Sequence, residues 1–217
     1  MYARSTTFQA GRPSAPGRRS ASTPLMDAGI DFLRSEVVPA VQAMDGCLGM
    51  SMMANRGSGR CIVTSSWESM DGMRASDSAI APMRERAGTM LGGLPFVEEW
   101  EIAAMHRHHR THEGACVRAT WMHGAATDLE RGVDLFRMVT MPALESLDGF
   151  CSASLFLDRS DGRAVISATY DSPARMLASR EQATDLRMRT AREARVDVLD
   201  VAEFDLLHAH LRVPEMA

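Results

Sequence analysis

Residues 29–76 read GIDFLRSEVVPAVQAMDGCLGMSMMANRGSGRCIVTSSWESMDGMRAS, and residues 132–179 read GVDLFRMVTMPALESLDGFCSASLFLDRSDGRAVISATYDSPARMLAS. The second segment follows the first at a shift of about 103 residues, and roughly fifteen of about forty-eight aligned pairs are identical. Pro39 and Pro142 are one such pair. A gap-free repeat of this length predicts two copies of one small domain in tandem.

Each copy is expected to contain the same six elements in the order strand, helix, strand, strand, helix, strand. Apolar residues at helical spacing mark the helices, and apolar runs bounded by Gly, Asn and Asp mark the strands. The two middle strands form a hairpin around a turn that favours positive φ. The expected elements are residues 2–10, 26–44, 47–54, 60–67, 69–90 and 96–103 in the first copy, and residues 116–122, 128–147, 150–157, 163–170, 172–194 and 196–207 in the second.

This β-α-β-β-α-β order predicts a ferredoxin-like α+β domain, in which two helices cover one face of a four-stranded antiparallel sheet. The strands at residues 47–54 and 150–157 show little polar alternation, so both of their faces are expected to be buried. We therefore expect the sheets of the two copies to pack together within the chain.

The repeat also sets the expected domain limits. We place the first domain at residues 1–105, a short polar linker at residues 106–115 and the second domain at residues 116–217. The first copy is about eleven residues longer than the second between its first strand and first helix, an insertion that a surface loop tolerates. This insertion, residues 11–24, is rich in Pro, Gly, Ser and Arg, so we expect it to be mobile.

Composition excludes several classes of function. The chain has 217 residues, a net charge of −4 and no Lys, so it offers neither a Schiff-base lysine nor a P-loop lysine. No run approaches the roughly eighteen apolar residues of a membrane span, and no early segment has the pattern of a signal peptide. The four Cys residues form no CxxC pair. We expect a cytoplasmic protein that binds neither a membrane nor nucleic acid.

A small set of residues resembles a known family. In chain order these residues are Pro39, Gly46, Trp67, Glu68, Ser69 and Met73. Together they resemble the antibiotic biosynthesis monooxygenase (ABM) domains of the dimeric α/β-barrel superfamily. The resemblance implies that two ferredoxin-like domains pair as a barrel, here within one chain. A homodimer of the tandem chain stays open.

The same resemblance implies a ligand pocket between the helices and the sheet, lined by the ends of the first and third strands. Trp67 and Tyr170 occupy equivalent positions there, and an aromatic ring could stack on a planar substrate. Thr6, Thr120 and His123 are further lining candidates of the same kind. The alternative for both aromatic residues is a core role that seals the end of a strand.

The activity implied by the resemblance is oxygenation of a small aromatic or polyketide-like compound without a cofactor. Many enzymes of the family carry a histidine in the second helix, and the haem-degrading members add a tryptophan there and an asparagine in the first strand. Residues 69–90 and 172–194 contain neither His nor Trp, and residues 2–10 contain no Asn. Haem degradation is therefore not expected, and the catalytic residues are not identified. The alternatives are a catalytically silent binding or sensing protein and a structural pairing module.

Four histidines gather in the expected linker. His106, His108, His109 and His112 have the short spacing of imidazoles that bind zinc or nickel. No carboxylate or thiolate accompanies them at ligand spacing, so we expect neither a structural nor a catalytic metal site.

Arg4 and Arg118 occupy matching positions in the first strands, where a buried charge needs a partner. The fourth strand is expected to lie beside the first, and it carries acidic residues in both copies. We therefore expect cross-strand ion pairs, with anion binding as the second interpretation. The acidic candidates are Glu99 and Glu101 in the first copy, and Glu203 and Asp205 in the second.

Overall fold

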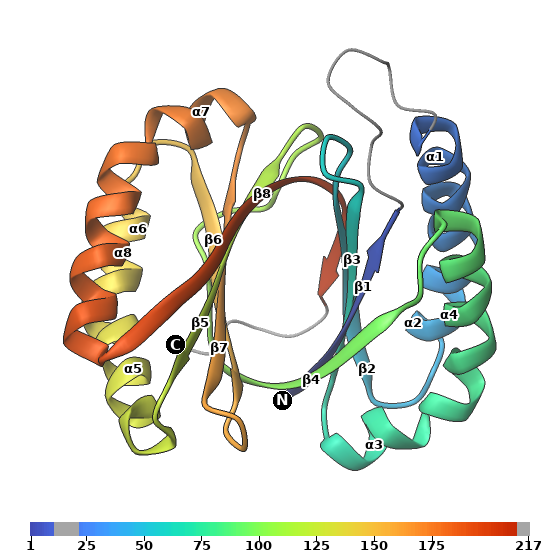
Figure 1. The fold of residues 1–217 in the computed structure, drawn as a ribbon, viewed down its shortest axis with the longest axis horizontal. Helices are drawn as coiled ribbons and strands as arrows, with labels where there is room; N and C mark the ends of the chain where they lie inside the picture. Colours follow the sequence, from blue (N-terminus) through green and yellow to red (C-terminus); the bar gives the residue numbers. More distant parts are fainter. Residues whose placement is uncertain (11–21, 212–217) are drawn as a thin grey trace. The chain divides into compact units, whose positions relative to one another are not determined.

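The computed structural model describes residues 1–10 and 22–211 of the chain. The chain divides into two compact units (Figure 1). Unit 1 contains the chain up to Glu99 and the last strand from Leu206 onward, and unit 2 contains Trp100–Asp205. Most of the expected insertion at residues 11–24 lies outside the described residues, which resume at Ser22.

Unit 1 has the expected order of elements. Its elements are β1 (Tyr2–Gln9), α1 (Ser22–Phe32), η1 (Leu33–Val37), α2 (Val38–Gln42), β2 (Cys47–Asn55), β3 (Arg60–Trp67), α3 (Met70–Ala75), α4 (Asp77–Leu91) and the start of β4 (Phe96–Arg107). β3 pairs antiparallel with both β1 and β2, and Trp67 lies opposite Tyr2 and Cys47. In Figure 1 the helices of this unit all lie on one face of its sheet.

Unit 2 repeats the order. Its elements are the rest of β4, β5 (Cys116–Gly124), η2 (Ala126–Asp128), α5 (Leu129–Leu135), η3 (Phe136–Thr140), α6 (Met141–Glu145), β6 (Phe150–Asp158), β7 (Arg163–Tyr170), α7 (Pro173–Ala178), α8 (Arg180–Ala194) and β8 (Val196–Leu211). Within this unit β4, β6, β7, β5 and β8 are neighbours in that order, all antiparallel. The expected pair of ferredoxin-like domains is confirmed. No helix among the described residues is both long and apolar enough to cross a membrane.

The strands β4 and β8 are longer than the sequence suggests. β4 continues to Arg107, and His106 and Arg107 pair with Ala153 and Ser152 of β6. The expectation of a linker beginning at residue 106 is therefore wrong for these two residues. The contacts divide the units inside β4 and β8, so part of each of these strands belongs to either unit.

Both first helices contain a π-helical turn just before a proline. The turns are η1 and η3, and the prolines are Pro39 and Pro142. Proline has no N–H to donate and its ring crowds the carbonyl four residues earlier, so a wider turn relieves the clash. In unit 1 the turn buries Leu33 and Val37 against the sheet side of the helix layer.

Serine side chains begin the helices that follow each hairpin. The Ser69 hydroxyl accepts a hydrogen bond from the Gly72 N–H at 3.0 Å, and the Ser172 hydroxyl accepts one from the Arg175 N–H at 3.3 Å. The predicted cap at Ser69 is confirmed. Such a cap satisfies one of the free donors at a helix start.

Each unit has a hydrophobic core of its own. In unit 1 the helices close over Trp67, Met73 and the inward side chains of β2, and in unit 2 they close over Tyr170 and Phe150. Trp67 and Tyr170 are each 0% exposed. Both aromatic side chains therefore belong to the cores of their units.

Candidate functional site

A small cavity lies between the helices and the sheet of unit 1. Its volume is about 30 Å³, which is space for about two water molecules. Side chains from β1, β2 and β3 line one side, and side chains from η1, α2 and α4 line the other. The polar lining residues are Arg4, Thr6, Ser65 and Arg84, and the rest of the lining is apolar.

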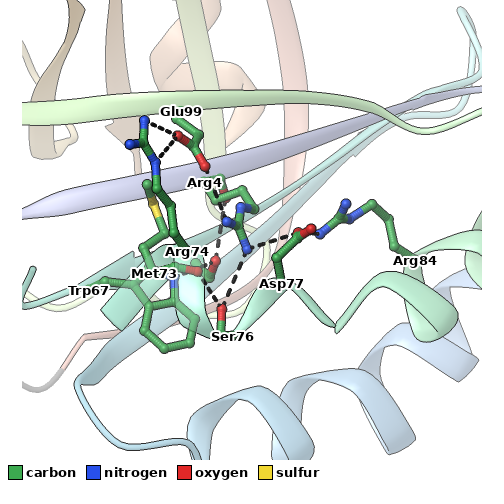
Figure 2. Close-up of polar contacts among 9 residues, drawn as sticks. Arg4, Trp67, Met73, Arg74, Ser76, Asp77, Arg84 and Glu99 are labelled. Carbon is green, nitrogen blue, oxygen red and sulfur yellow. Dashed lines mark hydrogen bonds and ion pairs between the residues drawn. The ribbon is translucent and has the colours of Figure 1, made fainter. Parts of the chain in front are cut away.

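Arg4 is the charged group on the strand side of the cavity. It lies in the middle of β1, and its side chain is 4% exposed. Its Nη2 donates to Glu99 Oε1 at 3.1 Å, and its Nη1 lies 3.3 Å from Asp77 Oδ1 and donates to Ser76 Oγ at 3.4 Å (Figure 2). The ion pair expected between the first and fourth strands is therefore present, with Glu99 as the partner.

Arg84 approaches the cavity from α4. Its Nη2 donates to Asp77 Oδ1 at 2.6 Å, so this carboxylate bridges Arg84 and Arg4 (Figure 2). The hydrogen bond from Arg84, and then the charges of Arg84 and Arg4, hold the pKa of Asp77 below its usual value against the opposing effect of burial. Arg74 pairs with the other oxygen of Glu99 at 3.0 Å. Three guanidinium groups and two carboxylates are thus linked by these ion pairs.

Two of the guanidinium N–H groups lack an acceptor among the described residues. The Nε atoms of Arg4 and Arg84 are buried and make no hydrogen bond. A buried donor left without a partner costs about 1–3 kcal/mol, and more when the group is charged. Both arginines also line the cavity, so its polar end favours an anionic or strongly accepting ligand.

The unit 1 candidates from the sequence lie at this cavity in different ways. Thr6 lines it directly. Trp67 does not line it, but its indole N–H donates to Ser65 Oγ at 2.9 Å and so fixes the orientation of a lining hydroxyl. The Trp67 ring therefore supports the cavity from behind, and a ligand there would not stack on it.

Unit 2 builds the same buried arginine. Arg118 in β5 donates to Glu203 Oε1 at 3.0 Å, to Ser179 Oγ at 3.4 Å and to the Met176 carbonyl at 2.7 Å. Its guanidinium carbon lies 5.5 Å from the centre of the Tyr170 ring, within the range of a cation–π contact. The ion pair expected with the fourth strand is present here as well, with Glu203 as the partner.

The helix layer of unit 2 also contains an arginine at the position equivalent to Arg84. Arg187 stands about 103 residues after Arg84, and Arg180 stands at the same shift after Asp77. Burial, and then the charge of Arg118, lower the pKa of Arg187. The carboxylate that bridges two arginines in unit 1 is thus an arginine in unit 2.

The remaining candidates lie in unit 2. The Tyr170 hydroxyl is buried with no hydrogen-bond partner of good geometry among the described residues, and burial raises its pKa. Thr120 is buried in the middle of β5. His123 is exposed near the end of β5, opposite Arg163 and Asp197. Neither Thr120 nor His123 is among the residues that line the unit 1 cavity.

Sequence reasoning missed Arg84, Asp77 and Ser65 as site residues. Arg84 had a detectable signal, since Arg187 follows it at the shift of the repeat, just beyond the segment of strongest identity. Asp77 and Ser65 had none, because Asp77 is replaced by Arg180 in the second copy and serine is common in strands.

In the structure, the histidines at the end of β4 and after it lie close to carboxylates and a thiol that are distant in the sequence. His106 and His108 lie 3.4 Å and 3.1 Å from Glu145 Oε1, and His109 lies 2.9 Å from Asp171 Oδ1. The thiol of Cys151 adds a third donor to the second group. No carboxylate or thiol stands at ligand spacing from these histidines in the sequence. In the folded structure Glu145, Asp171 and Cys151 lie close to them, so the expectation that they have no such partners is wrong.

Known proteins resemble this chain in fold and in sequence. No family model matches it. A proposed monooxygenase from Lactobacillus acidophilus superimposes with a TM-score of 0.67 at 8% identity, covering 97% of this chain and 96% of that one. An anthrone oxidase-like protein superimposes with a TM-score of 0.66 at 14% identity, covering 100% and 95%. A regulator of staphylococcal pathogenesis gives 0.54 at 6% identity, covering 95% and 98%. At these identities the likeness concerns the fold alone.

Sequence relatives are much more similar. The uncharacterized protein Rv2557 of Mycobacterium tuberculosis is 50% identical over 216 residues, which cover 100% of this chain and 92% of the relative. The uncharacterized protein Rv2558 of the same organism is 49% identical over 217 residues, covering 100% and 87%. With identity of this level over its whole length, the chain belongs to the family of Rv2557 and Rv2558.

Proposed function

We propose that unit 1 binds a small phenolic or quinol-type compound as its oxyanion, and that the protein oxygenates this compound without a metal or flavin. The observation that carries the proposal is the cavity between helices and sheet with two arginines in its lining. Arg4 and Arg84 both line the cavity, and their Nε–H groups are buried without acceptors among the described residues. A phenolate oxygen would supply the missing acceptor and would gain from the charge of the two arginines.

The chemistry asked of the protein is modest. An electron-rich phenolate can reduce oxygen directly, so the site needs to bind the anion, exclude water and hold the reacting carbon beside O₂. When the reacting carbon of the substrate is a CH₂ group, one oxygen atom of O₂ replaces the two hydrogens of that carbon, and the other oxygen atom leaves as water. Arg4 and Arg84 would favour the ionised substrate, and the apolar remainder of the lining would face its ring.

The choice of substrate class draws support from the fold neighbours. Two of the proteins that share this fold are described as a proposed monooxygenase and as anthrone oxidase-like. Anthrones and their anthrol tautomers are planar compounds with phenolic oxygens, which suits one polar end and an otherwise apolar lining. They are therefore the first compounds to test.

The cavity must enlarge to accept a ring, since about 30 Å³ holds only about two waters. Met50 lines it and has three rotatable bonds, which lets its side chain move at low cost. Leu33 and Val37 lie on the π-helical turn, a feature that often occurs at functional sites. These three residues are the expected points of adjustment.

A second candidate function is binding or sensing without turnover. One observation favours it: the described residues that line the cavity include no His, Asp, Glu, Cys or Tyr side chain that could act as a general base. The protein would then bind the same class of anion and release it unchanged. The regulator with this fold is compatible with such a role.

Oxygen uptake by purified, metal-stripped protein separates the two functions. The panel consists of anthrols, quinols and simpler phenols, each compared with its own rate in the absence of protein. We expect saturable uptake with at least one anthrol, and equilibrium binding of the same compound measured without oxygen.

Matched variants assign the activity to a unit. Arg84→Met should lower both binding and uptake by at least about tenfold, equivalent to about 1.4 kcal/mol, whereas Arg187→Met in unit 2 should leave both unchanged. Saturable binding without uptake would establish the second candidate. Absence of binding across the panel, or equal effects of the two substitutions, would refute the assignment to unit 1.

A further inference from the structure

The chain that follows β4 brings His109 to two residues that are distant in the sequence. Cys151 lies in β6, and Asp171 directly follows β7. His109 Nε2 lies 2.9 Å from Asp171 Oδ1, and Cys151 Sγ lies 3.2 Å from the same oxygen. The imidazole nitrogen, the thiol sulfur and a carboxylate oxygen all lie within 4.8 Å of one another.

These separations are close to those of donors around a tetrahedral zinc ion. Zinc bonds of about 2.0–2.3 Å place neighbouring donor atoms about 3.3–3.8 Å apart. The observed 2.9 Å and 3.2 Å contacts need only a small outward movement to admit an ion. Imidazole and thiolate are ligands that zinc prefers and that magnesium and calcium do not.

The backbone around the three donors is held in place by hydrogen bonds. The Cys151 carbonyl accepts from the N–H groups of His108 at 2.8 Å and His109 at 3.3 Å, and the Asp171 N–H donates to the Gly149 carbonyl at 2.8 Å. Cys151 is buried, and the side chains of His109 and Asp171 are 35% and 34% exposed. The thiol therefore lies at the base of the group, and an ion could enter from the solvent side.

The ring of His112 lies beside the ring of His109. The two rings stack with their centroids 6.2 Å apart. His112 also contributes to holding the pKa of Asp171 below its usual value, after the larger effects of His109 and Cys151. The group formed by His109, Cys151 and Asp171 therefore has a second imidazole beside it.

A catalytic triad does not explain this arrangement. In a cysteine triad the thiol contacts the imidazole, whereas here Asp171 lies between Cys151 and His109. Burial, and then the hydrogen bond to Asp171, raise the pKa of Cys151 to about 12. A thiol in that state is a poor nucleophile, while coordination to a metal ion would deprotonate it.

We propose that unit 2 contains a binding site for a divalent transition-metal ion, zinc being the best match, formed by His109 Nε2, Cys151 Sγ and the Asp171 carboxylate. Unit 1 has no counterpart, because the repeat places Leu48 and Glu68 at the positions of Cys151 and Asp171. The site is independent of the proposed oxygenation, which takes place in the other unit.

A second group of donors nearby provides an internal comparison. His106 and His108 lie close to Glu145. The exposed fraction of the side chain is 29% for His106, 53% for His108 and 41% for Glu145. This group has no thiol. Its greater exposure and its lack of sulfur make it the weaker of the two for zinc.

The test is metal binding by the full-length protein, reduced and stripped of metal. Zinc is titrated in competition with a chromophoric chelator, and cobalt is titrated separately to detect the thiolate-to-cobalt charge-transfer absorption that a cysteine ligand produces. We expect one zinc ion per chain and the charge-transfer band. Cys151→Ser and Asp171→Asn should each weaken zinc binding by at least about tenfold, and Cys151→Ser should abolish the band.

Two substitutions serve as matched controls. Cys61→Ser removes a buried thiol in unit 1 whose pKa burial likewise raises to about 12, and Glu145→Gln removes the carboxylate of the second group. Both should bind zinc as the unaltered protein does. His109→Ala tests the same site at a partly exposed residue, in case Cys151→Ser does not fold.

The proposal is overturned by either of two results. One is the absence of zinc binding together with the absence of the cobalt band. The other is loss of binding in Glu145→Gln with full binding in His109→Ala and Asp171→Asn, which would place the ion on His106 and His108. Neither result depends on oxygen uptake, so failure here and failure of the proposed function remain distinct.

Discussion

Arg4 in unit 1 and Arg118 in unit 2 occupy equivalent positions in β1 and β5, but the residues around them differ. Arg4 meets Asp77, which also holds Arg84, and a cavity remains beside them. Arg118 instead donates to the Met176 carbonyl and lies over the Tyr170 ring. The strand pairing thus sets the arginine and its glutamate partner, while the residues at the start of the following helix decide what else the guanidinium contacts.

The largest expected effect tests whether the two arginines are structurally equivalent. Arg4→Met and Arg118→Met each leave partly buried carboxylates without one of their cations, so each should lower the free energy of unfolding by about 3 kcal/mol. Urea denaturation at neutral pH measures both. A loss in one variant only would show that the equivalence is confined to the backbone.

The next effect concerns the two buried aromatic residues. Trp67→Phe removes the indole N–H that binds Ser65 and leaves unfilled volume, and it should cost about 2 kcal/mol. Tyr170→Phe removes a buried hydroxyl that has no partner of good geometry, so it should be neutral or slightly stabilising. The same denaturation series compares them. A cost for Tyr170→Phe above that of Trp67→Phe would contradict this account.

The helix caps give a smaller difference. Ser69→Ala should cost about 1 kcal/mol, and Ser172→Ala somewhat less, because its hydrogen bond is longer and Pro173 already favours a helix start. Thermal unfolding of the two variants side by side measures the order. Substitution of each serine by Asp, which can also cap, serves as the control and should restore most of the stability.

The smallest effect is the pH dependence contributed by Asp77. Its pKa is lower in the folded protein than in the unfolded chain, so its contribution is present above the unfolded value near 3.8 and is lost as the pH falls through the folded value. The side chain is 49% exposed, so solvent screening keeps the contribution below about 1 kcal/mol. Denaturation between about pH 5 and about pH 2.5 should show a shallower decline in Asp77→Asn than in the unaltered protein. Identical declines would remove Asp77 from the bridge.

Much of the fold could be read from local patterns. The turn glycines Gly46 and Gly149 have positive φ at equivalent positions, and the hairpins between them and the Ser caps begin and end close to the expected residues. These features depend on neighbouring residues, which is why they can be predicted from the sequence. The lengths of β4 and β8 depend on distant pairing partners, so both strands extend beyond the ranges 96–103 and 196–207 that the sequence predicts.

The candidate site was predicted less completely. Thr6 and the buried Arg4 were identifiable because their copies stand at matching positions in the second half. Asp77 was not, since its role depends on two arginines from separate elements that converge on one carboxylate. Likewise, no spacing in the sequence relates His109 to Cys151 and Asp171, which are about forty and sixty residues further along.

The sequence by itself determined the repeat, the order of elements and the two buried arginines, because periodicity, capping and the need to pair a buried charge act over short distances or through the repeat. Only the tertiary structure decided where the cavity lies, which carboxylate bridges Arg4 and Arg84, and which side chains surround the histidines. Those outcomes depend on side chains that meet across strands and helices, and the geometry of such meetings is set by packing that no local pattern records.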